Sequence, residues 1–190
     1  NYIKPYYNLG IVLFAEQKIE EAISQYKMAI KLNPDFVLAH NNLGSALRRI
    51  GKTREAISHY RTAIKLNPNY AEAHTNLGGA LLSEQKTEEA ISHYRTAIKL
   101  NSEYADAYYN LGDALISEQK TEEAISLYRK AIKLKPDFAD AHNNLGNALL
   151  QKGEIKEAID HYRETLKLKP DLVLAQKNLE TALLLSEELE

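Results

Sequence analysis

Several residue types that often carry chemistry are missing from this 190-residue sequence. It contains no cysteine, no tryptophan and a single methionine. Without cysteine the chain has no disulfide, no thiol nucleophile and no thiolate ligand for a metal. It also lacks any apolar run near the ~18 residues that a membrane-spanning helix needs. The sequence therefore predicts no membrane insertion, and we expect a cytoplasmic location.

An excess of charge of either sign is also missing. The sequence has 24 basic and 26 acidic side chains, which leaves a formal net charge of -2. Nucleic-acid-binding proteins generally need a broad positive surface. The composition therefore predicts no nucleic-acid partner, and any charge-based recognition must be local. The chain begins at Asn1 with neither an initiator methionine nor a signal-like segment, and we interpret it as part of a longer protein.

What the sequence does contain is a 34-residue repeat that runs from end to end. We call a set of positions that recur with this period a column. A Leu-Gly column is formed by Leu9-Gly10, Leu43-Gly44, Leu77-Gly78, Leu111-Gly112 and Leu145-Gly146. An alanine column is formed by Ala22, Ala56, Ala90, Ala124 and Ala158, and a tyrosine column by Tyr26, Tyr60, Tyr94, Tyr128 and Tyr162. A proline column is formed by Pro34, Pro68, Pro136 and Pro170, with Ser102 in the remaining place. Apolar residues recur at helical spacing in two stretches of each repeat, which predicts two amphipathic helices.

The ends of the predicted helices carry chemical markers. Thr53, Thr87 and Thr121 stand where an N-cap belongs, and glutamates follow in the first turn, where carboxylates favour the positive helix end. The pair Asn33-Pro34 likewise suits a cap followed by proline in the first helical turn. The repeated glycine lies inside a helix, where it costs about 1 kcal/mol relative to alanine. We therefore expect two helices to approach closely there, with the alanine of the second helix packed over the glycine.

These columns resemble the tetratricopeptide repeat, a helix-turn-helix unit with aromatic, Leu-Gly, alanine and proline positions. The resemblance implies an all-α fold, an α-solenoid with a right-handed superhelix, built from five repeats and a C-terminal capping helix. The expected single domain, 1–190, divides into repeats 3–36, 37–70, 71–104, 105–138 and 139–172, with the capping helix at 173–190. In that helix Glu180 replaces the repeated glycine and would obstruct a closely packed partner. The adjoining run Leu183 to Leu185 suggests self-association or a contact with sequence outside this chain.

Histidines and paired glutamates are the residues that could suggest catalysis or metal binding. The histidines form two columns, His40, His74 and His142, and His59, His93 and His161. The first of these stands where the tetratricopeptide pattern typically has tryptophan. Neither has the local spacing of a zinc site, so we favour packing or surface roles and expect no metal and no cofactor. Pairs such as Glu88-Glu89 could be acid-base residues, but their place at helix starts favours interaction with the helix dipole. No phosphate loop or nucleophile-base motif is present, which predicts a non-catalytic chain.

Basic residues recur late in the second helices. They are Arg61 with Lys65, Arg95 with Lys99, Arg129 with Lys133, and Arg163 with Lys167. Cations are favourable at helix C-termini, so a solvated structural face is the preferred interpretation. Binding of nucleic acid or another anionic surface is the alternative.

The family resemblance also indicates where a ligand would bind. Its first helices line a concave groove, and the residue before each Leu-Gly points into that groove. Here this residue is always asparagine, at Asn8, Asn42, Asn76, Asn110, Asn144 and, in the last helix, Asn178. A side-chain amide offers a donor and an acceptor and can bind the backbone of an extended peptide. This asparagine row resembles the asparagine ladder in the repeat domain of O-linked N-acetylglucosamine transferase. Alternatively, asparagine only fills the site and holds the turn between repeats.

Specificity should come from groove positions that differ between repeats. The candidates are Tyr7, Arg48, Arg49, Asp106, Tyr109, Asp113 and Asp140. They predict a ligand that is basic toward the C-terminal half and carries a carboxylate near Arg48, unless the variation is only that of a solvated surface. The sequence thus predicts a protein-protein interaction scaffold that binds an extended peptide or partner segment in the groove. The alternative is a structural or oligomerising segment of a larger, possibly enzymatic protein.

Overall fold

The computed structural model describes residues 3–187, and within that range it contains eleven helices and no strand. The helices are α1 (Ile3–Ala15), α2 (Ile19–Leu32), α3 (Val37–Arg49), α4 (Thr53–Leu66), α5 (Ala71–Ser83), α6 (Thr87–Leu100), α7 (Ala105–Ser117), α8 (Thr121–Leu134), α9 (Ala139–Gln151), α10 (Ile155–Leu168) and α11 (Val173–Glu187). None of the helices in this described part is long and apolar enough to cross a bilayer.

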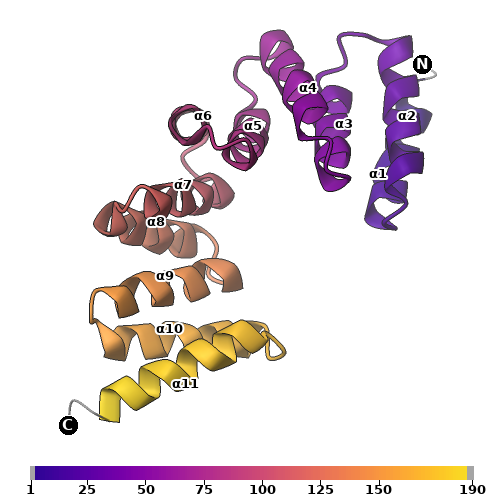
Figure 1. The fold of residues 1–190 in the computed structure, drawn as a ribbon. Helices are drawn as coiled ribbons and strands as arrows, with labels where there is room; N and C mark the ends of the chain where they lie inside the picture. The colour runs from indigo at the N-terminus through magenta and orange to yellow at the C-terminus, as the bar shows by residue number, and fades with distance from the viewer. Residues whose placement is uncertain (1–2, 188–190) are drawn as a thin grey trace. The chain divides into compact units, whose positions relative to one another are not determined.

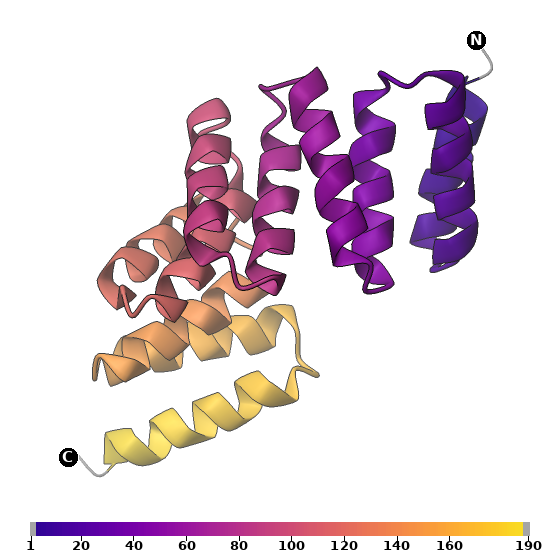
Figure 2. The same ribbon diagram turned by 45° about the horizontal axis from the view of Figure 1, so that its top comes forward.

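The helices from α1 to α10 pack in consecutive pairs as hairpins, and α11 packs on α10 (Figure 1). The chain divides into two compact units, 1–102 and 103–190, which are described separately. Unit 1 contains α1 to α6, and unit 2 contains α7 to α11. Figure 2 shows the hairpins of each unit following one another in chain order. The predicted all-α solenoid is confirmed, whereas the single domain and its repeat limits stay predictions.

In each hairpin, a residue with left-handed backbone conformation closes the turn between the two helices. Gln17, Gln85 and Gln119 have φ of 63°, 60° and 59°, and Gly51 and Gly153 hold the same place with φ of 79° and 80°. At α5 the N–H of Lys86 donates to the carbonyl of Leu81 at 2.9 Å, across the left-handed residue. This hydrogen bond belongs to the Schellman motif, which satisfies the last carbonyls of a helix.

The predicted threonine caps are wrong by one residue. Thr53 is already the first residue of α4, and the cap position is held by Lys52, whose side chain makes no capping hydrogen bond. Thr87 and Thr121 are shifted in the same way at α6 and α8. The reason is that the lysine backbone carbonyl begins the helical ladder, accepting from the N–H of Ala56 at 3.0 Å in α4.

The Asn-Pro pair also has a different role from the predicted one. Asn33 ends α2 as its C-cap, and α3 begins only at Val37. The side-chain oxygen of Asn33 accepts a hydrogen bond from the backbone N–H of Asp35 at 3.1 Å. Such an Asx turn places proline in the connection between hairpins and not in the first turn of the next helix.

The repeated glycine contacts the tyrosine column, and this corrects the predicted alanine partner. A Cβ atom added to Gly44 would lie only 2.6 Å from Cε1 of Tyr60, on the second helix of the same hairpin. The equivalent distances at the other glycines of this column are 2.6 or 2.7 Å. The close approach was therefore predicted correctly, but a buried ring occupies the space that the missing side chain leaves.

Leucines of the Leu-Gly column complete the interior. Leu43, Leu77 and Leu145 are at most 1% exposed, whereas Leu9 of α1 is 47% exposed. Among the described residues no hairpin precedes α1, so its member of the leucine column, Leu9, is left uncovered. Helix α11 also exposes large apolar side chains, including Leu174 at 57% and Leu184 at 62%.

Candidate partner-binding face

The first helices of neighbouring hairpins contact one another within each unit. Helices α1, α3 and α5 do so in unit 1, and α7, α9 and α11 do so in unit 2. We call the surface that carries the asparagine row on these helices the odd-helix face. All of the predicted groove residues belong to these helices.

The asparagine row makes hydrogen bonds between neighbouring repeats. Each donor contacts the residue that precedes the asparagine of the previous repeat, thirty-five positions earlier. The amide nitrogens of Asn42, Asn76, Asn144 and Asn178 donate to Tyr7 Oη at 3.1 Å, Asn41 Oδ1 at 3.0 Å, Tyr109 Oη at 3.1 Å and Asn143 Oδ1 at 3.3 Å. The row therefore links the first helices of neighbouring repeats by hydrogen bonds. Asn8 is exposed on α1 and Asn110 half-buried on α7.

The two predicted groove tyrosines also contact the following repeat through their rings. The ring of Tyr7 lies against Phe36, with 4.8 Å between ring centroids, and Tyr109 lies against Phe138 at 4.9 Å. Each phenylalanine comes from the connection that leads into the next hairpin. Tyr7 and Tyr109 therefore combine an aromatic contact with an accepted hydrogen bond between repeats.

The buried tyrosine column reaches the odd-helix face through its hydroxyl groups. Tyr60 donates to Ser45 Oγ at 3.1 Å, and Tyr128 donates to Asp113 Oδ1 at 2.7 Å. Tyr162 donates to Asn147 at 2.8 Å. Burial raises the pKa of Tyr162 to about 12, and burial followed by the nearby Asp113 charge raises the pKa of Tyr128 well above its usual range. These hydroxyls therefore stay protonated and keep donating at neutral pH.

In unit 2 the acceptor Asp113 lies in an open pocket of about 320 Å³. The pocket is lined by Asp113, Ile116, Tyr128, Asn144, Asn147, Ala148 and Gln151. Besides the tyrosine hydroxyl, Asp113 Oδ1 accepts a hydrogen bond from Asn144 Nδ2 at 2.9 Å. This arrangement holds the carboxylate at a defined place on the odd-helix face.

In unit 1 the corresponding region carries a positive charge. A Cβ atom on Gly79 would lie 2.9 Å from Arg48 Nη1, so the guanidinium covers the surface of α5 beside that glycine. Burial raises the pKa of Tyr60, and the Ser45 hydrogen bond and the Arg48 charge oppose that rise. Arg49 instead donates to Gln17 Oε1 at 2.9 Å. The two arginines thus have different neighbours, and Arg48 is the one that lies over the next repeat.

The remaining predicted acidic residues differ from Asp113. The carboxylate of Asp140 forms an ion pair with Lys169 Nζ at 2.8 Å. Asp106 is half-buried in the first turn of α7, where a carboxylate interacts favourably with the helix dipole. Of the three, Asp113 is the one that lines the pocket.

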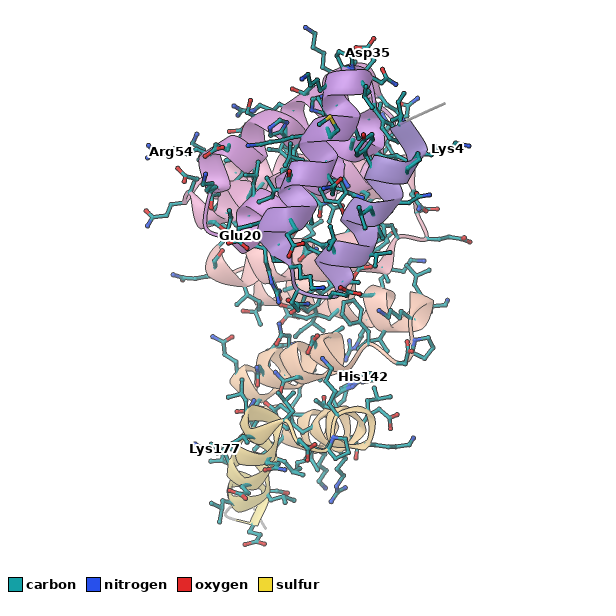
Figure 3. The ribbon with its side chains drawn as sticks, turned by 90° about the vertical axis from the view of Figure 1, so that its right-hand side faces the viewer. Lys4, Glu20, Asp35, Arg54, His142 and Lys177 are labelled. Carbon is teal, nitrogen blue, oxygen red and sulfur yellow. The ribbon has the colours of Figure 1, made fainter. Side chains whose placement is uncertain are left out.

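Histidines of the two columns form pairs inside hairpins, which the sequence analysis missed. His40 Nδ1 lies 3.1 Å from His59 Nδ1, and His40 Nε2 donates to the carbonyl of Pro34 at 2.9 Å. His40 therefore accepts through Nδ1 from a protonated His59 Nδ1 when both rings are neutral. The same geometry recurs at His74 with His93 and at His142 with His161, both at 3.0 Å; His142 is labelled in Figure 3. We call these contacts the histidine pairs.

A signal for the histidine pairs exists in the repeat itself. The repeats at 37–70, 71–104 and 139–172 carry both histidines, whereas those at 3–36 and 105–138 carry neither. Zinc bonds an imidazole nitrogen at about 2.0–2.1 Å in a tetrahedral arrangement, so two nitrogens that share an ion lie about 3.3 Å apart. The facing nitrogens are closer than that, and the described residues contain no group of three or more metal-ligating side chains.

Basic residues of the second helices take part in ion pairs between hairpins. Arg61 Nη2 lies 2.8 Å from Glu89, and Arg129 Nη2 lies 2.8 Å from Glu157. Both pairs are about half exposed, so each contributes only about 0–1 kcal/mol to stability. These contacts support the interpretation of this ridge as a solvated structural face.

Comparison with known proteins identifies the repeat. Family models described as TPR repeat match residues 10–51, 44–84, 78–117 and 112–153, and one described as tetratricopeptide repeat matches 139–172. No curated protein matches the sequence.

Solved structures provide a second comparison. A structure of MamA protein is 32% identical, covers 88% of this chain and 92% of its own, and has a TM-score of 0.70. The protein TTC0263 of Thermus thermophilus is 21% identical with a TM-score of 0.80, covering 96% of this chain and 99% of its own. YrrB, described as a TPR protein with an unusual peptide-binding site, is 23% identical with a TM-score of 0.67, covering 91% and 89%. The last two likenesses concern the fold alone.

Proposed function

Since this chain belongs to the tetratricopeptide repeat family, a family of protein-interaction scaffolds, we propose that it binds an extended segment of a partner protein along its odd-helix face. The observation that supports this proposal is the open pocket of about 320 Å³ on that face of unit 2. Pockets with a few converging polar groups are the default binding sites of proteins. The proposed role of the chain is to hold a partner, and no chemical step is required of it.

The asparagine row would contribute to such binding unequally. An amide nitrogen has two N–H groups. Within the described range Asn76 donates one hydrogen bond, to Asn41, whereas Asn144 donates two, to Tyr109 and Asp113. We therefore assign backbone binding to Asn76 in unit 1, and a supporting role to Asn144.

A selection experiment tests the proposal. The immobilised protein would be exposed to a displayed library of random peptides, and bound peptides would be measured for affinity. Gln151→Trp places a bulky ring at the mouth of the pocket, and Ser126→Trp places the same ring at an exposed position of α8. We expect the first variant to abolish binding and the second to retain it. Equal binding by both variants, with helicity unchanged, would contradict a site on the odd-helix face.

A second function is favoured by one specific observation, the exposed apolar side chains of α11. Leu174 and Leu184 are 57% and 62% exposed, and Leu183 and Leu185 add to them. A helix of this kind can bury its apolar surface against another chain, which would make the protein a structural or oligomerising segment. Light scattering over a dilution series separates the two functions. Oligomers that persist on dilution and are broken by Leu184→Glu would favour assembly.

A further inference from the structure

We propose that the pocket around Asp113 is a subsite for a lysine or arginine side chain of the partner. This inference rests on the proposed function and specifies the chemistry of the bound segment. It combines a carboxylate without a cationic neighbour, an apolar wall and a fixed geometry.

In the described part of the chain the charge of Asp113 is not matched by a cation, unlike the charges of several other acidic residues of unit 2. Asp140 pairs with Lys169 at 2.8 Å, and Glu157 pairs with Arg129 at 2.8 Å. Within residues 3–187, Asp113 has no ion-pair partner, and its polar neighbours are the hydroxyls of Tyr128 and Tyr109 and the amide of Asn144. A half-buried carboxylate of this kind attracts a cation from a partner because ionised groups form the stronger hydrogen bonds.

The carboxylate of Asp113 is held in one orientation by its hydrogen bonds. Two hydrogen bonds, from Tyr128 Oη and Asn144 Nδ2, end on Oδ1. The donors are themselves held, since the Tyr128 ring packs against Gly112 and Asn144 also donates to Tyr109. Oδ2 takes part in neither of these two bonds. Because the carboxylate is already held through Oδ1, it does not lose further freedom when a ligand binds. Such preorganisation lowers the entropic cost of binding.

The pocket combines apolar and polar side chains. Ile116 and Ala148 provide an apolar wall, and Asn147 and Gln151 add side-chain amides. Lysine and arginine bury aliphatic stems against apolar surface while their charged ends bind polar groups. An ammonium group has three donors and no acceptor, so carboxylate and amide oxygens suit it. A neutral side chain would leave the charge of Asp113 unmatched, and an acidic one would be repelled by it.

The other repeats do not reproduce this chemistry. The column of Asp113 contains Ile11, Ser45, Gly79 and Asn147, without a second carboxylate. At the position of Ile116, the repeat at 37–70 has Arg48, whose charge would repel a cation. Specificity of this kind requires repulsion elsewhere as well as attraction at the site. The basic residue of the partner would therefore bind unit 2 and not unit 1.

The experiment uses N-acetyl-lysine N-methylamide as the probe, with the norleucine derivative as an uncharged control of similar length. Amide NMR spectra of the full chain would be recorded during titration with each. We expect saturable shifts around Asp113, Ile116 and Asn147 with the lysine probe and little change with norleucine. Asp113→Asn keeps an oxygen that can accept from Tyr128 and Asn144 but removes the charge. It should weaken the lysine probe by about tenfold or more, because a charged hydrogen bond is lost.

Some outcomes would overturn the subsite. Equal shifts with norleucine, or unchanged lysine affinity in a folded Asp113→Asn variant with a normal spectrum, would do so. Its failure is distinguishable from failure of the proposed function. Selected peptides that are blocked by Gln151→Trp but carry no basic residue and bind Asp113→Asn normally would leave a peptide scaffold without this subsite. A lysine probe that binds when no peptide binds would support the subsite and contradict the proposed binding of an extended segment.

Discussion

The odd-helix faces of units 1 and 2 share the same frame and differ in charge. In both units an asparagine links neighbouring repeats and a buried tyrosine hydroxyl reaches the residue beside the glycine. In unit 1 that residue is Ser45 or Gly79, and Arg48 lies over the surface. In unit 2 it is Asp113 or Asn147, with a pocket between them.

This difference shows how a repeat protein can change its binding chemistry without changing its fold. The packing of the frame depends on small or apolar columns that are buried in every hairpin, such as Ala56 and Ala124 at 0% exposure. The charged positions lie at the surface, where substitutions cost little stability. A single residue beside the glycine can therefore alter what the face attracts while the tyrosine behind it remains in place.

The largest expected effect tests whether the frame is the same in both units. Leu77→Ala in unit 1 and Leu145→Ala in unit 2 remove side chains that are 1% and 0% exposed. Each should lower the free energy of unfolding by about 2–5 kcal/mol, because a cavity is left in a packed interior. Leu9→Ala, at a position 47% exposed, is the matched control and should cost about 1 kcal/mol or less. Urea denaturation followed by circular dichroism measures all three, and a large difference between the two buried leucines would show that the frames differ.

The next effect separates the frame from the variable position beside it. A Cβ on Gly78 would lie 2.6 Å from the buried ring of Tyr94, whereas a Cβ on Gly79 would meet the end of the flexible Arg48 side chain at 2.9 Å. Gly78→Ala should destabilise by about 1–2 kcal/mol, since overpacking outweighs the gain in helix propensity. Gly79→Ala should stabilise by up to about 1 kcal/mol, since Arg48 can move away. Thermal unfolding of the two variants should therefore shift in opposite directions, and shifts of the same sign would contradict this distinction.

The smallest effect concerns pH, because unit 1 contains two histidine pairs and unit 2 contains one. Burial and then the partner histidine lower the pKa values of His59, His93 and His161 below the ordinary 6.5. The unfolded chain thus binds protons more readily than the folded one as pH falls. The contribution of these histidines to the free energy of unfolding should be fully present above pH 6.5. It should decline below pH 6.5 and level off once the pH falls below their lowered pKa values in the folded chain.

Hydrogen exchange at a series of pH values would locate this loss. We expect the amides of α3 to α6 to lose more protection than those of α9 and α10. The control replaces His59, His93 and His161 by glutamine, which the repeat at 3–36 carries naturally as Gln25. This variant should flatten the pH profile between 6.5 and the lowered pKa values. An unchanged profile would show that the histidine pairs do not control it.

Much of the fold could be predicted because an amphipathic helix shows a periodic pattern of apolar residues within a short stretch of sequence. The period of apolar residues identified two helices per repeat, and the interior glycine correctly indicated a close helix contact. Local markers were weaker at the helix ends. Thr53 suits an N-cap chemically, but the turn inside the hairpin places Lys52 at that position. Asn33 suits a cap as well, and the structure uses it at the other end of a helix.

The candidate face was predictable in its location but not in its hydrogen bonds. The asparagine row was visible in the sequence, whereas its partners Tyr7 and Asn41 lie thirty-five positions before their donors. The histidine pairs were missed because the two columns were considered separately, although both histidines are present or absent together in every complete repeat. Comparison between columns of the same repeat would have found them.

The sequence by itself determined that this protein is a series of helical hairpins of one repeated kind, because helical periodicity and side-chain size act within a hairpin. Only the tertiary structure decided that Arg48 covers Gly79 in one unit and that Asp113 lies in a pocket in the other. These relations depend on how one hairpin packs on the next, since that packing brings residues of different repeats to the same surface. Side-chain identity alone specifies the charge, and packing between hairpins specifies which groups surround it.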